Sequence, residues 1–159
     1  MATKKATKKK STLNKAGIRL LADDLVAHKK MYDQDTYGDY ENECGTFCCL
    51  AGFCYRREIG ARKFAQWAKD KGKDTDLAED AGRKQLGLKD DIDIFNPFEC
   101  WPSDLVEEYE SNGPTWRVIA ALKALQRLRP DGSIDPNPKK IHTRIPQLKA
   151  LLATAKKAK

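Results

Sequence analysis

Apolar side chains recur at intervals of three and four residues along much of this 159-residue chain, which is the spacing of one face of an α-helix. The first such stretch covers residues 13–30, and the clearest covers residues 115–128. The apolar positions of residues 115–128 are Val118, Ala121, Leu122, Leu125 and Leu128. No segment alternates β-branched residues over four or more positions, as a half-buried strand would. The pattern therefore predicts an all-α fold.

Besides a helix in the cysteine-rich segment described below, three shorter helices are expected between these two. The first covers residues 61–71, with Phe64, Trp67 and Ala68 on one side. The second covers residues 75–86 and is expected to turn Leu77, Ala78 and Ala81 inward, and the third is a short helix over residues 103–110. A last helix, over residues 146–156, carries leucines on one face and lysines on the other.

The segment 43–55, ECGTFCCLAGFCY, holds four of the five cysteines and almost no charge. We expect Thr46 to cap a helix here, because threonine favours that position and Gly45 before it permits a tight entry. The apolar positions are Phe47, Cys49, Leu50, Ala51, Phe53 and Cys54, which surround the helix almost completely. A helix that is apolar on all sides is buried. The prediction is a compact multi-helix domain built around a buried cysteine-rich helix.

Composition divides the chain into four parts. Residues 1–12 lack periodic apolar positions and are expected to form a disordered basic tail, while residues 13–128 form the helical domain. Residues 129–144, which include RPDGSIDPNP, have the composition of a linker. Residues 145–159 predict an amphipathic helix with a basic C-terminal end. We therefore expect one domain flanked by flexible basic tails.

Charge is strongly segregated along the chain. The formal net charge is +7, but residues 1–15 and 139–159 together carry 13 lysines and arginines and no acid. Residues 16–138 therefore carry a net charge of −6. Because partners respond to the local distribution of charge, the two ends and the middle of the chain should behave differently.

Clustered lysines on flexible arms suit the phosphate backbone of nucleic acids, where each neutralised phosphate releases counterions. Aromatic residues that would stack on bases are absent from both arms, so no single-strand recognition is expected. The arms could equally be solubilising tails or intramolecular partners of the acidic middle. The candidate nucleic-acid-binding residues are Lys4, Lys5, Lys8, Lys9, Lys10, Lys139, Lys140, Arg144, Lys156, Lys157 and Lys159.

The cysteines offer a second kind of site. Cys44 would lie just before a helix N-terminus, where the helix dipole lowers the pKa of a thiol, and Cys49 would lie within disulfide reach of it. A nucleophilic cysteine also needs a base, and the chain offers only His28, at the end of the first helix, and His142, beyond the linker. Compact core thiols are the simpler interpretation.

Metal sites are not expected. A zinc site would draw on a histidine and on Cys44, Cys48 or Cys49, Cys54 and Cys100, but this spacing differs from the usual C-x2-C pairs. A calcium loop beginning at Asp33 fails at its fifth position, Tyr37, and at its twelfth, Cys44. We expect no cofactor.

An odd number of cysteines and no secretory signal favour a reducing compartment, so a cytoplasmic location is expected. No apolar run is long enough to span a membrane.

The order of these motifs over residues 18–128 resembles a family of small, uncharacterised bacterial and phage proteins. The shared features are LLADDL, an aromatic and acidic loop, a C-G-T-x-x-C-x-x-G-W motif, A-x-x-x-x-L-G-L, I-F and W-P. The matching motif positions are Cys44, Gly45, Thr46, Cys49 and Gly52, with Phe53 in place of the tryptophan. The resemblance implies the helical fold, a packing role for Cys48 and Cys54, and a pairing of Cys44 with Cys49. It implies no particular activity.

Two functions follow as hypotheses. The leading one is a non-enzymatic binding protein whose basic arms contact nucleic acid or an assembly that contains it. The alternative is a thiol-based enzyme or redox switch centred on Cys44 and Cys49.

Overall fold

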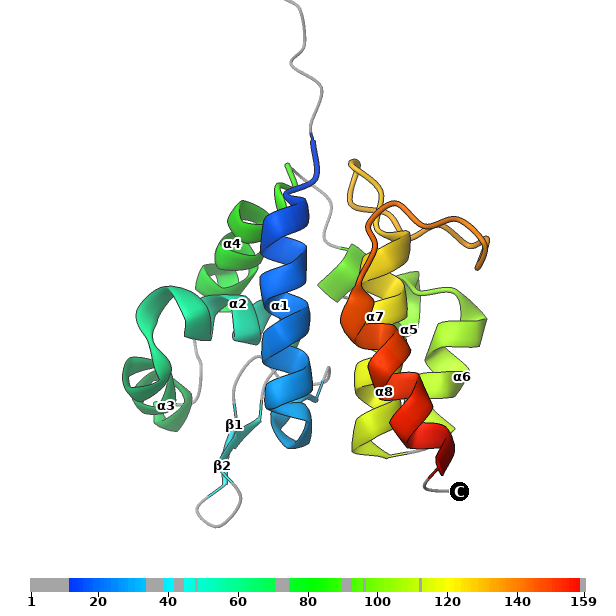
Figure 1. Cartoon of the computed structure of the whole chain (residues 1–159). Helices are drawn as coiled ribbons and strands as arrows, with labels where there is room; N and C mark the ends of the chain where they lie inside the picture. Colours follow the sequence, from blue (N-terminus) through cyan, green and yellow to red (C-terminus); the bar gives the residue numbers. More distant parts are fainter. Residues whose placement is uncertain are drawn as a thin grey trace, which may run out of the picture.

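The computed structural model describes residues 12–33, 39–41, 45–47, 49–70, 75–89, 93–95, 97–111 and 113–157 (Figure 1). Their α-helices are α1 (Lys15–Ala27), α2 (Leu50–Ile59), α3 (Ala61–Lys69), α4 (Thr75–Leu86), α5 (Pro97–Cys100), α6 (Ser103–Ser111), α7 (Pro114–Arg127) and α8 (Pro146–Lys157). Short 3-10 helices lie at Lys29–Met31 and Asp93–Phe95. The all-α prediction is confirmed, and the strongly periodic segments form helices close to the expected bounds.

A short β-ribbon was not predicted. Strands β1 (Asp39–Glu41) and β2 (Gly45–Phe47) pair antiparallel, with Tyr40 opposite Thr46. Strands of three residues are too short to show the alternation by which a strand is recognised in a sequence.

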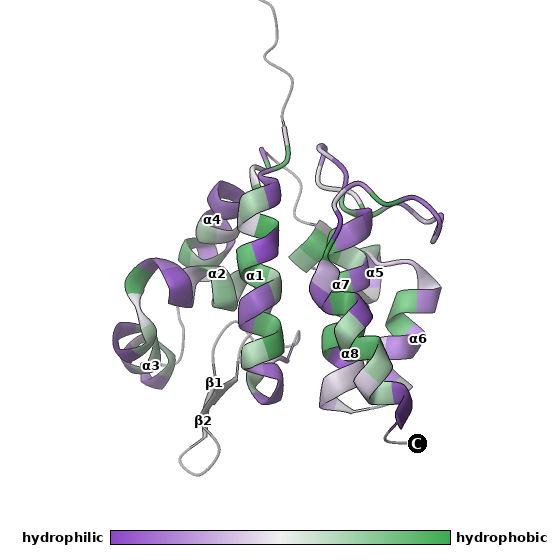
Figure 2. Cartoon of the chain, in the orientation of Figure 1, coloured by the Kyte–Doolittle hydropathy of each residue, from purple (hydrophilic) through white to green (hydrophobic). Residues whose placement is uncertain are grey.

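Helix α1 joins the two halves of the fold. In Figure 1 it stands between α2, α3 and α4 on one side and α5 to α8 on the other, and it contacts α2, α4, α7 and α8. Hydrophobic and hydrophilic residues alternate in bands along α1 (Figure 2), because its buried residues, Gly17, Ile18, Leu21, Ala22 and Leu25, recur at helical spacing. The core is therefore continuous across both halves.

The first half of α2 lies at the centre of this core. Leu50, Ala51, Phe53 and Cys54 are at most 1% exposed, and α2 packs against α4, α3 and α1. The residues that follow them, Arg56 to Glu58, carry charge and reach the surface. The expected buried helix is thus present, although only its first half is enclosed. On α4, by contrast, Leu77 was expected to face inward and is 42% exposed.

The start of α2 was predicted wrongly. Thr46 does not cap the helix, because it lies in β2, and α2 begins at Leu50 with Cys49 as its N-cap. The Cys49 Sγ accepts a hydrogen bond from the backbone N–H of Gly52 at 3.5 Å. Threonine and phenylalanine favour extended backbone, and pairing with β1 decides their conformation. Cys54 lies within α2, whereas Cys44 and Cys48 fall outside the described residues.

The C-terminal part of the chain is folded onto the domain. Residues 129–144 were expected to be a linker, yet Ile134 and Thr143 are buried there, and Leu128 forms a β-bridge with Ile134. The backbone N–H of His142 donates to the carbonyl of Gln126 at 2.8 Å. Helix α8 then packs on α7 and α1 through Leu148, Leu151 and Ala155. Residues 139–157 are therefore not a flexible arm, whereas residues 1–11 lie outside the described part.

Candidate functional site

Cys49 and Cys54 are enclosed by the core. Each is at most 1% exposed. Burial raises the pKa of Cys49 from its ordinary value of 9.0 to about 12, although the backbone N–H of Gly52 lowers it in part. Burial also raises the pKa of Cys54, and the nearby Cys49 thiol adds to that effect. Both groups are therefore protonated at neutral pH, which is the unreactive form of a thiol.

This burial predicts slow labelling of both thiols. At pH 7, Cys49 and Cys54 should react with iodoacetamide far more slowly than the half-buried Cys100, and unfolding should remove the difference. Because the Cys49 thiol has a pKa of about 12 when folded and 9.0 when unfolded, the free energy of unfolding should fall as the pH rises from about 9 towards 12. Mass spectrometry of the labelled peptides measures each site. Labelling of Cys49 as fast as free cysteine would contradict this burial.

The other chemical candidates find little support. His28 is the C-cap of α1, and His142 Nε2 lies 3.2 Å from Asp135 Oδ2. Among the described residues, no three histidine, cysteine, aspartate or glutamate side chains gather closely enough to hold a metal ion. None of the described helices has both the length and the apolar character needed to cross a bilayer.

The exposed basic residues of the C-terminal segment offer a stronger candidate. We call this set the C-terminal basic surface and define it by Lys139, Lys140, Arg144, Lys149, Lys156 and Lys157. All six side chains are exposed, and the sequence contains no acid after Asp135. Within the described ranges, none of the six forms an ion pair. Their charges are therefore available to a partner.

Basic residues in the body of the fold are neutralised more often. Arg57 pairs with Asp24 at 2.6 Å, Lys123 pairs with Glu108 at 2.7 Å, and Arg127 lies 2.6 Å from the carboxylate of Asp104. An ion pair within the fold leaves little net field for an external ligand. Within the described residues, the segment after Asp135 therefore combines exposed cations with a complete absence of acids.

The loop that carries Lys139 and Lys140 is held by Asp135. Its carboxylate accepts the backbone N–H of Asn137 at 3.0 Å, lies 3.2 Å from His142 Nε2 and pairs with Arg129 at 3.0 Å. The hydrogen bond from Asn137 contributes most to lowering the pKa of Asp135 to about 2, followed by His142 and Arg129. Because this carboxylate stays ionised at neutral pH, it fixes the loop on the end of α7.

The structure accounts for part of the predicted basic site. Lys139, Lys140 and Arg144 lie on the folded loop, while Lys156 and Lys157 lie in the last turn of α8. Lys4, Lys5, Lys8, Lys9, Lys10 and Lys159 lie outside the described residues. The described chain begins at Thr12, at the end of the molecule where the loop 129–144 also lies in the view of Figure 1.

Lys149 was missing from the predicted site. It precedes Lys156 by seven residues on α8, and a separation of two helical turns places both on the same side. This spacing was visible in the sequence as the polar face of an amphipathic helix. Searching for lysines on that face, and not only for lysine clusters, would have found Lys149.

Comparisons with models of protein families, with curated proteins and with solved structures found no match to this chain.

Proposed function

We propose that this protein binds the phosphate backbone of nucleic acid through the C-terminal basic surface, assisted by the lysines of residues 1–10. The observation that carries the proposal is the set of six exposed cations that form no ion pair with the described residues. The proposal differs from the sequence-based hypothesis in one respect, since most of the C-terminal cations sit on folded structure. A folded surface presents its charges without the entropic cost of ordering an arm.

Binding of this kind has no specificity for base sequence. Lysine and arginine contacts to phosphate release counterions and position a protein on a duplex, but they carry no sequence information. The acidic residues in the rest of the chain would repel nucleic acid and so favour approach through the basic surface. We therefore infer a binding or packaging role and no catalytic step.

Neutralising the loop lysines should weaken duplex binding. The double variant Lys139→Gln, Lys140→Gln removes two exposed cations and should bind a fluorescent DNA duplex at least about tenfold more weakly at ~0.1 M salt. Fluorescence anisotropy measures the affinity. Removal of residues 1–12, which include five lysines, should weaken binding further.

The matched control lies on α3. Arg62 and Lys63 are also adjacent, exposed and basic, and Arg62→Gln, Lys63→Gln changes the net charge by the same amount. This control should retain nearly full affinity. Equal losses in the two double variants would contradict a localised basic surface and would leave only a general effect of net charge.

The alternative of a thiol enzyme or redox switch at Cys44 and Cys49 gains no support from the described geometry, because the Cys49 thiol is buried and protonated. The free, buried thiols of Cys49 and Cys54 fit the proposed reducing, cytoplasmic location.

A further inference from the structure

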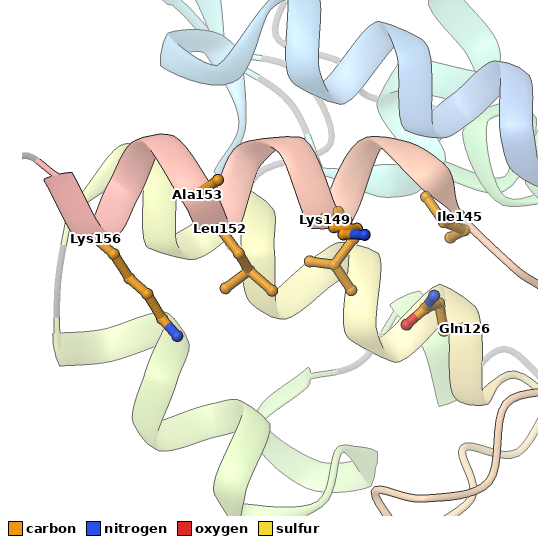
Figure 3. Close-up of a pocket in the computed structure, with 7 residues that line it drawn as sticks. Gln126, Ile145, Lys149, Leu152, Ala153 and Lys156 are labelled. Atoms are coloured by element: carbon orange, nitrogen blue, oxygen red, sulfur yellow. The ribbon is translucent and has the colours of Figure 1, made fainter.

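A groove runs along the contact between α7 and α8. It has a volume of about 490 Å³ and is lined by Gln126 of α7 together with Ile145, Leu148, Lys149, Leu152, Ala153 and Lys156. Figure 3 shows Leu152 and Lys156 projecting from α8 on the side where α7 lies. The groove follows α8 from Ile145 to Lys156, which at 1.5 Å per residue is about 16 Å, or three helical turns.

The lining combines an apolar floor with a basic edge. Ile145 and Leu148 are buried, Leu152 is half-buried, and Lys149 and Lys156 are exposed. The lining includes no carboxylate. Phosphates could pair with the two lysines, but a nucleic-acid backbone has no apolar side chains to cover the half-buried Leu152. A ligand that covers the apolar floor must itself carry apolar side chains, unlike the phosphate backbone proposed as the ligand of Lys139 and Lys140.

Acids on the neighbouring helix do not cancel this positive edge. Helix α6 packs on α7, and two of its acids, Asp104 and Glu108, already pair with basic residues of α7. Glu108 pairs with Lys123 at 2.7 Å, and Asp104 pairs with Arg127 at 2.6 Å. Lys149 and Lys156 remain the uncompensated charges of the lining.

We propose that this groove binds an acidic amphipathic helix of a partner protein. Leucine-like side chains of that helix cover the floor, and carboxylates two turns apart pair with Lys149 and Lys156. Helix-in-groove binding uses this combination of apolar anchors at helical spacing and flanking charge. The proposal goes beyond nucleic-acid binding. The groove shares Lys149 and Lys156 with the C-terminal basic surface, but Lys139 and Lys140 do not line it, so the loop double variant alters duplex binding without altering the groove.

A designed peptide tests the proposal. The probe is a fluorescent peptide of about four helical turns with leucine at successive third and fourth positions and glutamate elsewhere, and the control peptide carries lysine in place of each glutamate. Fluorescence anisotropy with the full chain measures both. We expect the glutamate peptide to bind and the lysine peptide not to bind.

Variants locate the binding. Leu152→Asp, which places a charge on the floor, should weaken the glutamate peptide at least about tenfold. The double variant Lys149→Glu, Lys156→Glu should weaken it similarly and should gain affinity for the lysine peptide. The control Leu77→Asp alters an exposed leucine on α4, away from the groove lining, and should leave the affinity unchanged within about twofold.

Several results would overturn the proposal. Equal binding of the two peptides, or unchanged binding after Lys149→Glu, Lys156→Glu, excludes a basic groove as the site. Self-association of the protein that Leu152→Asp abolishes identifies a second copy as the occupant. Absence of peptide binding by the unaltered chain, with loss of duplex binding in the charge variant, leaves Lys149 and Lys156 to the nucleic-acid surface alone and overturns the proposal. Because both lysines are exposed, the charge variants decide the outcome even if Leu152→Asp fails to fold.

Discussion

Replacing Phe53 by alanine should lower the free energy of unfolding by about 3–5 kcal/mol. Phe53 is 1% exposed in the buried half of α2, and its ring centroid lies 6.4 Å from that of Tyr32. The truncation removes buried apolar surface and leaves a cavity that the surrounding helices cannot fill completely. Denaturant unfolding followed by circular dichroism measures the change.

An exposed leucine provides the control for this substitution. Leu77→Ala on α4 should change the free energy of unfolding by no more than about 0.5 kcal/mol, because Leu77 is 42% exposed. If Phe53→Ala lowers the free energy of unfolding as little as Leu77→Ala does, α2 does not lie at the centre of the core.

Replacing Gly17 by alanine should destabilise the fold by about 3 kcal/mol. A Cβ at this position would clash with the backbone carbonyl oxygen of Gln85, where α1 passes α4. That oxygen belongs to helical backbone and cannot move aside without separating the two helices. An unconstrained glycine in a helix would give the opposite sign, since alanine there is favoured by up to about 1 kcal/mol.

Whether Gly17→Ala raises or lowers the free energy of unfolding decides if α1 and α4 are in close contact. Lys15→Ala changes an exposed residue in the first turn of the same helix and should have little effect. If Gly17→Ala stabilises the protein, α1 and α4 do not approach each other as closely as described. Thermal unfolding of both variants, compared with the unaltered chain, distinguishes these outcomes.

Helices could be predicted where the spacing of apolar residues or the composition of the segment itself indicates them. The apolar spacing of α1 and α7 and the composition of α4 predicted elements that the structure contains with nearly the expected bounds. Burial within a helix was less predictable, as Leu77 shows, because the sequence does not say which face a neighbouring element covers.

Features that depend on distant partners were missed. Thr46 has the residue type of a helix cap, but pairing between β1 and β2 places it in a strand. Residues 129–144 contain the prolines and glycine of a linker, yet Asp135 and the carbonyl of Gln126 hold them against α7. Local composition cannot reveal such contacts.

The candidate site was predictable in its charge and not in its shape. Counting basic residues identified Lys139, Lys140 and Arg144, because an acid-free run is visible in any sequence. The groove beside Lys149 and Leu152 exists only once α8 has packed on α7, so it could not be anticipated. The consequence is a folded basic surface with an apolar groove beside it, in place of a flexible arm.

The salt dependence of duplex binding tests the proposed function most directly. The logarithm of the association constant should fall linearly with the logarithm of the salt concentration, with a slope of about −0.9 for each phosphate contacted. The double variant Lys139→Gln, Lys140→Gln should make that slope shallower by about 2, whereas Arg62→Gln, Lys63→Gln should leave it unchanged. Binding that is insensitive to salt, or slopes that are identical in the two variants, would contradict a phosphate-binding surface at the C-terminal end of this protein.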